Sequence, residues 1–217
     1  AARRQQRQFL VPRGDQLSER LASVLEVVYL IFNEGYTAAR GDEWLRPQLC
    51  HDALRMGRVL TAIAPQEAEA HGLLALMELN ASRTAARTDA TGDPILLMDQ
   101  DRARWDQLQI RRGLLALARA HELGGGRGFY ALQAAIVACH ARAAVPGETD
   151  WQQIAGLYTE LASLVRSPII ELNRAVAVGM AEGPSAALAI VDRLVHEPAL
   201  KNYHLLESVR GDLLCKL

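Results

Sequence analysis

The sequence predicts an all-α protein built as a helix-pair array. Apolar residues recur at spacings of three and four along almost the whole chain, and no segment sustains the alternation of apolar and polar residues typical of strands. Half of the 217 residues are apolar, which is enough to bury a sizeable core. The centres of the predicted helices also recur at a fixed distance along the chain, which indicates repeated helix pairs.

The first predicted helix begins near Leu17 and is apolar on more than one side. Val27 and Leu30 fill the side opposite its main apolar stripe, so we expect neighbouring helices to enclose it as a core helix. The main stripe consists of Leu17, Leu21, Val24, Leu25, Val28, Ile31 and Phe32.

This helix runs directly into the polar stretch Asn33-Glu34-Gly35-Tyr36. We expect Gly35 to adopt the left-handed conformation that ends a helix, which would fold Tyr36 back against Ile31. Glu34 then lies in the last turn, where the helix dipole disfavours negative charge, so a basic partner is expected for it. Alternatively, Asn33 and Glu34 belong to a surface that contacts another domain.

Three further helices follow in the first half of the chain. Pro47 suits the first turn of a helix that runs to Ile63, and a third helix is expected over about 67–86. Residues 88–94, TDATGDP, form a turn-rich loop. We expect Asp101 to cap a fourth helix that ends at His121, before the glycine-rich stretch GGGRG.

Five more helices complete the prediction. They are a helix over about 129–144, one that is capped by Thr149 or Asp150 and ends at Leu164, one that starts at Pro168, one that runs from Gly183-Pro184 to about Val195, and one that follows Pro198.

Helix centres near residues 138, 174 and 207, and near 157 and 190, lie about 33 to 36 residues apart, a period typical of tetratricopeptide (TPR) helix pairs. Several residues fall near the signature positions of that repeat, namely Ala175, Val178, Ala187, Val191, Leu194 and Pro198. We therefore expect an N-terminal helical bundle that runs into a short TPR-like solenoid. The expected parts are a linker over 1–16, a helical subdomain over 17–123 and the repeats over 128–217, the last two in one continuous domain.

The formal charge is −1, yet residues 1–20 contain five arginines against Asp15 and Glu19. The rest of the chain is therefore net acidic and lacks the basic face that DNA or RNA binding requires. The three cysteines are odd in number and lie in helical patterns, which predicts reduced thiols. With no leader and no apolar run of membrane-spanning length in the sequence, we expect a cytoplasmic protein, a fragment of a longer one, that does not act at a membrane.

The densest polar cluster is MDQDRARWD, with Asp99, Asp101, Arg102 and Trp105. As a partner-binding surface it offers an aromatic anchor with arginine beside it, a combination enriched in binding hot spots. As structure, Asp101 caps a helix, Trp105 packs inward and the arginines pair with nearby acids. Both interpretations stay open at this point.

Asn173 and Arg174 interrupt the apolar stretch from Ile169 to Val178, so each needs a hydrogen-bonding partner. In a TPR pair the first helix lines a concave groove. The resemblance to that repeat implies that Asn173, together with Gln133 and His140 of the preceding first helix, could face a bound peptide or another domain. The alternative is an internal network that joins one repeat to the next.

The sequence offers no set of residues for catalysis, a metal or a cofactor. The acids Asp89, Asp93, Asp99 and Asp101 lack the spacing of a calcium loop. In the pairs Cys50-His51 and Cys139-His140, adjacent helix side chains point about 100° apart and do not share a proton. The GGGRG stretch follows a helix instead of a strand, so nucleotide binding there is not expected.

Six blocks in order, YLIFNEGY, LLALMELNASRTAARTDATGDP, QDRARWD, YALQAAIVACHA, DWQQIAGLY and SPIIELNRAVAV, resemble the C-terminal extension of one group of extracytoplasmic-function sigma factors. Members of that group carry a TPR-like domain after sigma region four. The resemblance covers nearly the whole chain from about Leu10. It implies a role in bacterial transcription initiation, with linked sigma regions two and four or core RNA polymerase as partners. Glu78 and Asn80 depart from it, since a more apolar or histidine-bearing stretch is expected there.

Nothing in the sequence resembles the sigma regions that grip polymerase and read promoters, so contact with promoter DNA is expected only through those missing regions. We expect a regulatory interaction domain that is not an enzyme. Two alternatives stay open. One is a free-standing TPR-like adaptor that binds peptides, and the other is an all-α enzyme that uses the acids between Asp99 and Asp106.

Overall fold

A computed structural model describes residues 15–36 and 46–217 and confirms the all-α prediction. The described residues form nine α-helices and no β-strand. An isolated antiparallel bridge between Thr88 and Pro94 is the β-type pairing in this part of the chain. The contacts divide the chain into two compact units, residues 1–53 and 54–217. The expected linker over 1–16 lies almost wholly outside the described residues.

The first unit contains α1 (Asp15–Tyr36) and the start of α2 (Pro47–Ile63), whose bounds match the prediction. One face of α1 buries Leu25, Val28 and Phe32. The expectation that neighbours enclose this helix is wrong, because Val27 and Leu30 are 55% and 58% exposed. Helical spacing shows that residues share a face but does not show that something covers it.

Gly35 does not take the predicted left-handed conformation and instead lies inside α1, where it is buried. The first turn of α2 passes so close that a Cβ on Gly35 would meet the Cys50 nitrogen at 2.7 Å. The Arg46 N–H donates to the Gly35 carbonyl at 2.8 Å. Tyr36 stacks on Phe32, one turn back, with ring centroids 5.4 Å apart.

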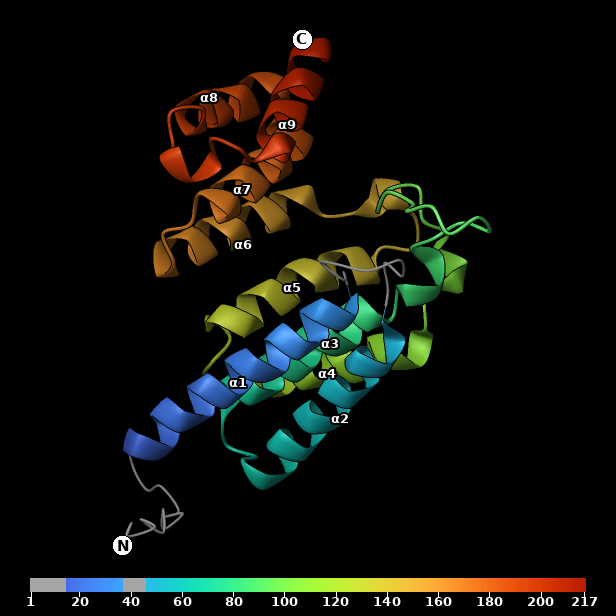
Figure 1. Ribbon diagram of the computed structural model, residues 1–217, viewed down its shortest axis with the longest axis vertical. Helices are drawn as coiled ribbons and strands as arrows, with labels where there is room; N and C mark the ends of the chain where they lie inside the picture. The colour runs from blue at the N-terminus through green and yellow to red at the C-terminus, as the bar shows by residue number, and fades with distance from the viewer. Residues whose placement is uncertain (1–14, 37–45) are drawn as a thin grey trace, which may run out of the picture. The chain divides into compact units, whose positions relative to one another are not determined.

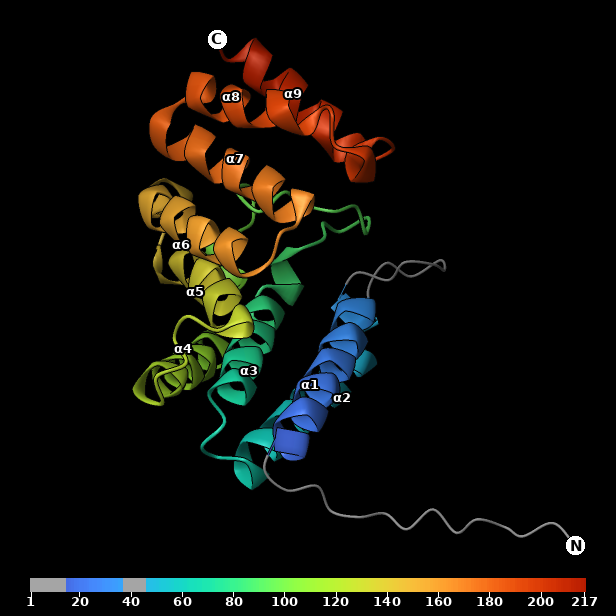
Figure 2. The same cartoon turned by 90° about the vertical axis from the view of Figure 1, so that its left-hand side faces the viewer.

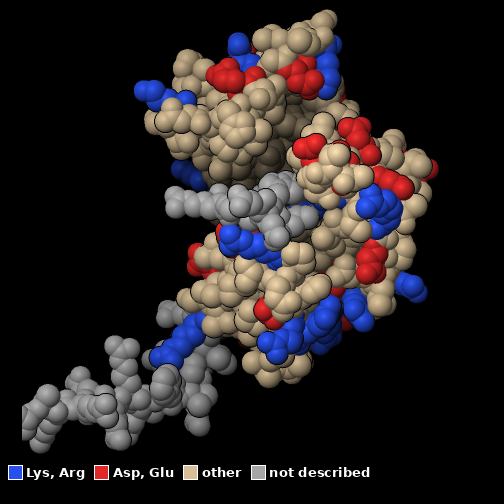
Figure 3. Space-filling view, turned by 45° about the vertical axis from the view of Figure 1, so that its right-hand side comes forward, with Lys and Arg blue, Asp and Glu red and all other residues tan. Residues whose placement is uncertain are grey.

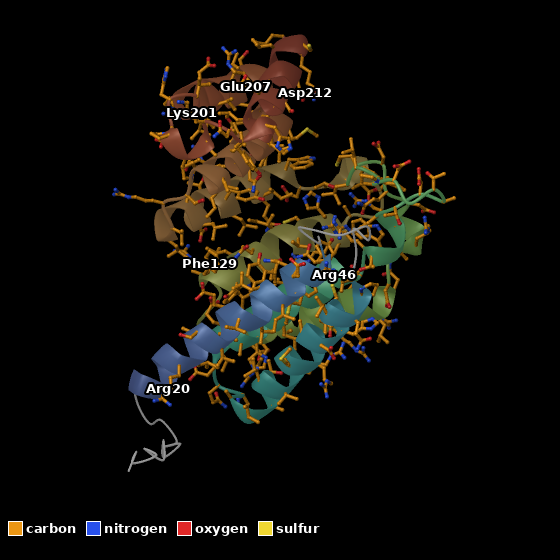
Figure 4. All side chains as sticks on the ribbon, viewed as in Figure 1. Arg20, Arg46, Phe129, Lys201, Glu207 and Asp212 are labelled. Carbon is orange, nitrogen blue, oxygen red and sulfur yellow. The ribbon has the colours of Figure 1, made fainter. Side chains whose placement is uncertain are left out.

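The basic partner predicted for Glu34 is confirmed. Arg46, labelled in Figure 4, donates from Nη1 to Glu34 Oε1 at 2.9 Å. The pair offsets the unfavourable position of a carboxylate in the last turn of α1. Asn33 beside it is half-buried.

The second unit consists of the end of α2 and seven further helices, which follow one another in chain order (Figures 1 and 2). They are α3 (Ala68–Ala81), α4 (Gln107–Glu122), α5 (Phe129–Arg142), α6 (Trp151–Leu164), α7 (Pro168–Glu182), α8 (Pro184–Leu194) and α9 (His204–Cys215). Because α3 packs against both α4 and α5, the core continues across GGGRG. A second cluster of buried residues joins α5 to α9.

Small residues let α3 lie very close to both neighbours. A Cβ on Gly72 would meet the Ala131 nitrogen of α5 at 2.8 Å, and one on Gly113 of α4 would meet the Leu79 side chain at 2.6 Å. Ala75 between them is fully buried. The contacts are possible because glycine and alanine have little or no side chain to keep the backbones apart. Packed on α4 and on α5, α3 lies in the interior of this part of the unit.

Two helix ends differ from the prediction for local reasons. Helix α3 stops at Ala81 because the hydroxyls of Ser82 and Thr84 and the amide of Asn80 donate to its last carbonyls. Asp101 caps only a 3₁₀ turn, whereas the Asp106 carboxylate accepts from the first N–H groups of α4.

Other helix limits agree with the prediction. Asp150 accepts from the Gln153 N–H and caps α6. Pro168 begins α7, and Gly183, with φ of 101°, separates α7 from α8. The three cysteines are free thiols, as predicted. Among the described helices, none has the length and apolar character needed to cross a membrane.

Gly72→Ala is expected to lower the free energy of unfolding by about 1–3 kcal/mol, because the added methyl meets backbone atoms of α5 that cannot rotate away. Gly156→Ala in α6 is the matched control, since a Cβ there meets nothing within 4 Å, and it should stabilise by about 0.5–1 kcal/mol. Urea denaturation measures both values. Equal effects of the two variants would contradict the close α3–α5 packing.

Candidate functional site

The predicted polar cluster consists largely of residues that hold the fold together. Trp105 is 3% exposed and packs inward, so it offers no exposed aromatic anchor. The carboxylate of Asp101 accepts from the Ala103 N–H at 2.9 Å. Asp99 is exposed. Trp105 therefore packs inward as considered above, whereas Asp101 caps the 3₁₀ turn and not helix α4. A role of these residues in partner binding stays a prediction.

Arg102 caps the C-terminal end of α5 from a distant part of the chain. Its Nη1 donates to the carbonyls of His140 and Ala143 at 2.8 and 2.6 Å, and its Nη2 donates to Thr149 Oγ1 at 3.1 Å. The last carbonyls of a helix lack partners inside the helix and carry partial negative charge, so a guanidinium satisfies both needs. Arg102 also lies over the Trp105 ring, 5.1 Å from its centroid.

His140 lies beneath this cap instead of facing an open groove. It is 8% exposed, and its ring meets Trp151 edge-on with centroids 5.2 Å apart. Burial, followed by the positive charges of Arg83 and Arg102, lowers the pKa of His140 to about 4. The imidazole is therefore neutral at pH 7.

The residues expected to line a TPR-like groove differ in exposure and in their partners. Asn173 is exposed on α7, whereas Gln133 is half-buried and its amide donates to the Phe129 carbonyl of its own helix at 3.2 Å. Arg174 pairs with Glu171 at 2.8 Å, one turn away. Of this group, Asn173 alone combines exposure with a position on an apolar face.

That face is the best candidate for an interaction surface, and we call it the α7 face. Ile169, Val176 and Met180 are 46%, 37% and 46% exposed and, with Asn173, repeat at helical spacing. The opposite side of α7 is buried against α6 and α8. A row of exposed apolar side chains on a helix that is otherwise packed is typical of a surface that meets a partner.

Charged side chains of both signs lie on the face that Figure 3 shows. Several basic ones adjoin one another in its lower part, and acidic ones are interspersed with other residues over the rest. The Asp89 carboxylate accepts from Thr91 and Asp93 within its own turn. Among the described residues, no group of three or more His, Cys, Asp or Glu side chains has the arrangement of a metal site.

Two acids of α3, the half-buried Glu69 and the buried Glu78, have partners that the sequence did not indicate. Glu69 of α3 accepts from the Tyr130 N–H at 2.9 Å and so caps α5 at the end opposite Arg102, while burial raises the pKa of its carboxyl. Glu78 is 1% exposed and pairs with Arg58. The signal available for Glu78 was a single acid within the apolar run LLALMEL, noted above only as a departure from the resemblance.

Two comparisons relate the chain to other proteins. Residues 20–121 match a family of unknown function, DUF6596. Over 211 residues, or 96% of its length, the chain is 44% identical to an uncharacterized protein of Rhizobium meliloti (strain 1021). The chain spans 49% of the length of that relative. No solved structure matches.

Arg102→Lys is expected to lower the free energy of unfolding by about 2 kcal/mol, because an ammonium group cannot reach the three acceptors that the guanidinium fork joins. The exposed neighbour Arg104→Lys is the control and should leave stability unchanged. Chemical denaturation compares the two. Equal stabilities would show that the cap on α5 contributes little.

The buried His140 predicts a stability loss in acid. Its pKa in the folded chain is about 4 against 6.5 for a free imidazole, so the unfolded chain binds a proton first. The contribution of neutral His140 to the free energy of unfolding is therefore fully present above pH 6.5. It falls by about 1.4 kcal/mol per pH unit as the pH drops toward 4. His140→Gln should flatten that slope, and His196→Gln, at an exposed site, should not. Unfolding measured from pH 7 to 4 checks this.

Proposed function

We propose that this chain is a regulatory, protein-interaction domain from the C-terminal part of an extracytoplasmic-function sigma factor. It modulates promoter-directed transcription by contacting sigma regions two and four or core RNA polymerase. In this proposal the domain acts by binding and performs no reaction of its own. Promoter DNA is contacted by the sigma regions and not by this chain.

The observation that carries the proposal is the α7 face. Ile169, Val176 and Met180 expose apolar surface around the Asn173 amide, on a helix held in place by α6 and α8. A partner that covers this face gains apolar burial, and the amide fixes its register through hydrogen bonds. Because the face is preformed, binding requires little ordering of the domain itself.

The sequence supports the sigma-factor context in two ways. The six ordered blocks resemble the C-terminal extension of these factors over nearly the whole chain. The Rhizobium meliloti relative is about twice as long as this chain, and the half outside the match leaves room for sigma regions two and four.

A tethered domain can regulate through a weak contact. Linkage raises the effective concentration of the partner surface to about the millimolar range, so a modest affinity is enough to shift the population. The α7 face would then favour one of two states, with the promoter-reading regions either covered or free. Whether the domain activates or inhibits transcription depends on which of these two states exposes the partner surface.

Val176→Arg in the full-length protein is expected to change promoter-directed transcription in vitro by about fivefold or more, because a buried guanidinium at the α7 face disrupts the contact. Val145→Arg is the matched control, since Val145 is 52% exposed and lies outside this face. Both variants should keep the helical circular dichroism of the parent. Transcription that is identical for the two variants would remove the α7 face as the contact surface.

A second comparison tests the domain as a whole. Transcription is measured for the full-length protein, for a version that ends near Arg13, and for that version with this chain added in trans. The proposal expects the truncated version to differ and the added chain to restore part of the difference. The same activity in all three reactions would refute the regulatory role.

A further inference from the structure

A surface rich in arginine lies on the second unit, on the C-terminal half of α2 and on α4, and we call it the arginine face. Residues 54–63 and 107–121 contain five arginines and no acid. Figure 3 shows basic side chains that adjoin one another in its lower part, at the height of α2 and α4 in Figure 1. The face shares no residue with the α7 face, so it has no part in the function proposed above. Its members are Arg58, Leu108, Arg111, Arg112 and Leu115.

Helix α4 presents an apolar stripe between two arginines. Leu108 and Leu115 are 51% and 72% exposed and lie two turns apart on one side of the helix. At about 100° per residue, Arg111 and Arg112 project to opposite sides of the line that joins the two leucines. Both arginines are exposed, and neither forms an ion pair with another of the described residues. The helix therefore offers two unpaired guanidinium groups beside exposed apolar surface.

A buried carboxylate holds the third arginine in position. Arg58 of α2 donates to Glu78 Oε1 from Nε at 2.9 Å and from Nη2 at 2.6 Å. The Glu78 side chain is 1% exposed, whereas that of Arg58 is 46% exposed. The guanidinium is thus fixed from beneath while part of it faces the solvent, so little side-chain entropy is lost when a partner binds it.

The two helices contribute to one continuous surface. Arg58 of α2 lines an open pocket of about 380 Å³ together with Arg112 and Leu115 of α4. The pocket thereby places an anchored guanidinium, an unpaired guanidinium and an exposed leucine beside one another. A segment that lies across it meets both helices at the same time.

Charge and apolar content together select the partner. Three arginines against Glu78 leave the face with two net positive charges, which an acidic partner complements. Nucleic-acid interfaces are more polar than protein interfaces, whereas Leu108 and Leu115 gain most from a partner that brings apolar side chains of its own. We infer that the arginine face binds an acidic amphipathic segment of a partner protein. The carboxylates of that segment pair with the arginines, and its apolar side chains cover the two leucines.

The test measures binding of a fluorescein-labelled peptide of alternating Glu-Glu and Leu-Leu pairs to the 217-residue chain by fluorescence anisotropy. Saturable binding is expected at or below about 100 μM. It should weaken by about threefold or more between about 50 and about 300 mM salt, because salt screens exposed charges. Two further probes should bind at least about fivefold more weakly. They are the same peptide with Gln in place of Leu and a thymidylate strand of the same charge.

Substitutions locate the surface. Arg112→Glu should weaken binding of the Glu–Leu peptide by about fivefold or more, and Arg193→Glu, at an exposed arginine of α8, should leave it within about twofold. Leu115→Gln should also weaken it by about fivefold, and this uncharged variant decides the matter if Arg112→Glu loses the helical circular dichroism of the parent. No saturable binding, binding of the thymidylate strand or the Gln peptide as tight as that of the Glu–Leu peptide, or equal loss with Arg112→Glu and Arg193→Glu would overturn the inference.

Discussion

Helix α5 is held at both ends by side chains of opposite charge that come from outside the helix, and the second unit depends on this arrangement. At its N-terminus the Glu69 carboxylate accepts from the Tyr130 N–H, and at its C-terminus Arg102 donates to the carbonyls of His140 and Ala143. An acid at the positive end and a base at the negative end both complement the helix dipole. Helix α5 packs on α3 and also on α6. Fixing α5 therefore joins the packing around α3 to the buried cluster that runs from α5 to α9.

The close packing around α3 explains why polar groups in this region are so specifically paired. Gly72 and Gly113 bring α5 and α4 close to α3, so there is little room for water beside the helix. A carboxylate there must find a donor within the protein, and Glu69 finds one in the first turn of α5. Glu78 pairs with Arg58 through Oε1, and its buried Oε2 has no donor among the described residues.

Local signals predicted much of the fold, and long-range contacts account for the rest. Pro47, Asp150, Pro168 and Gly183 act through their own backbone or the next turn, so the sequence alone located those helix limits. The role of Gly35 depends on α2 passing beside it, and that of Arg102 on carbonyls 38 and 41 residues away. Periodicity placed Val27 and Leu30 on one side of α1 but carried no information about whether that side was covered.

The same reasoning separates the candidate surfaces. Trp105 and His140 have the composition of a binding hot spot, yet they are buried and occupied in holding the end of α5, so a partner would have to open the core to reach them. At the α7 face, Ile169, Val176 and Met180 are accessible while their helix is fixed from behind by α6 and α8. A contact there uses surface that is already in position, so the free energy of binding is not spent on rearranging the fold. This difference in accessibility, and not residue type, makes the α7 face the stronger candidate for a regulatory contact.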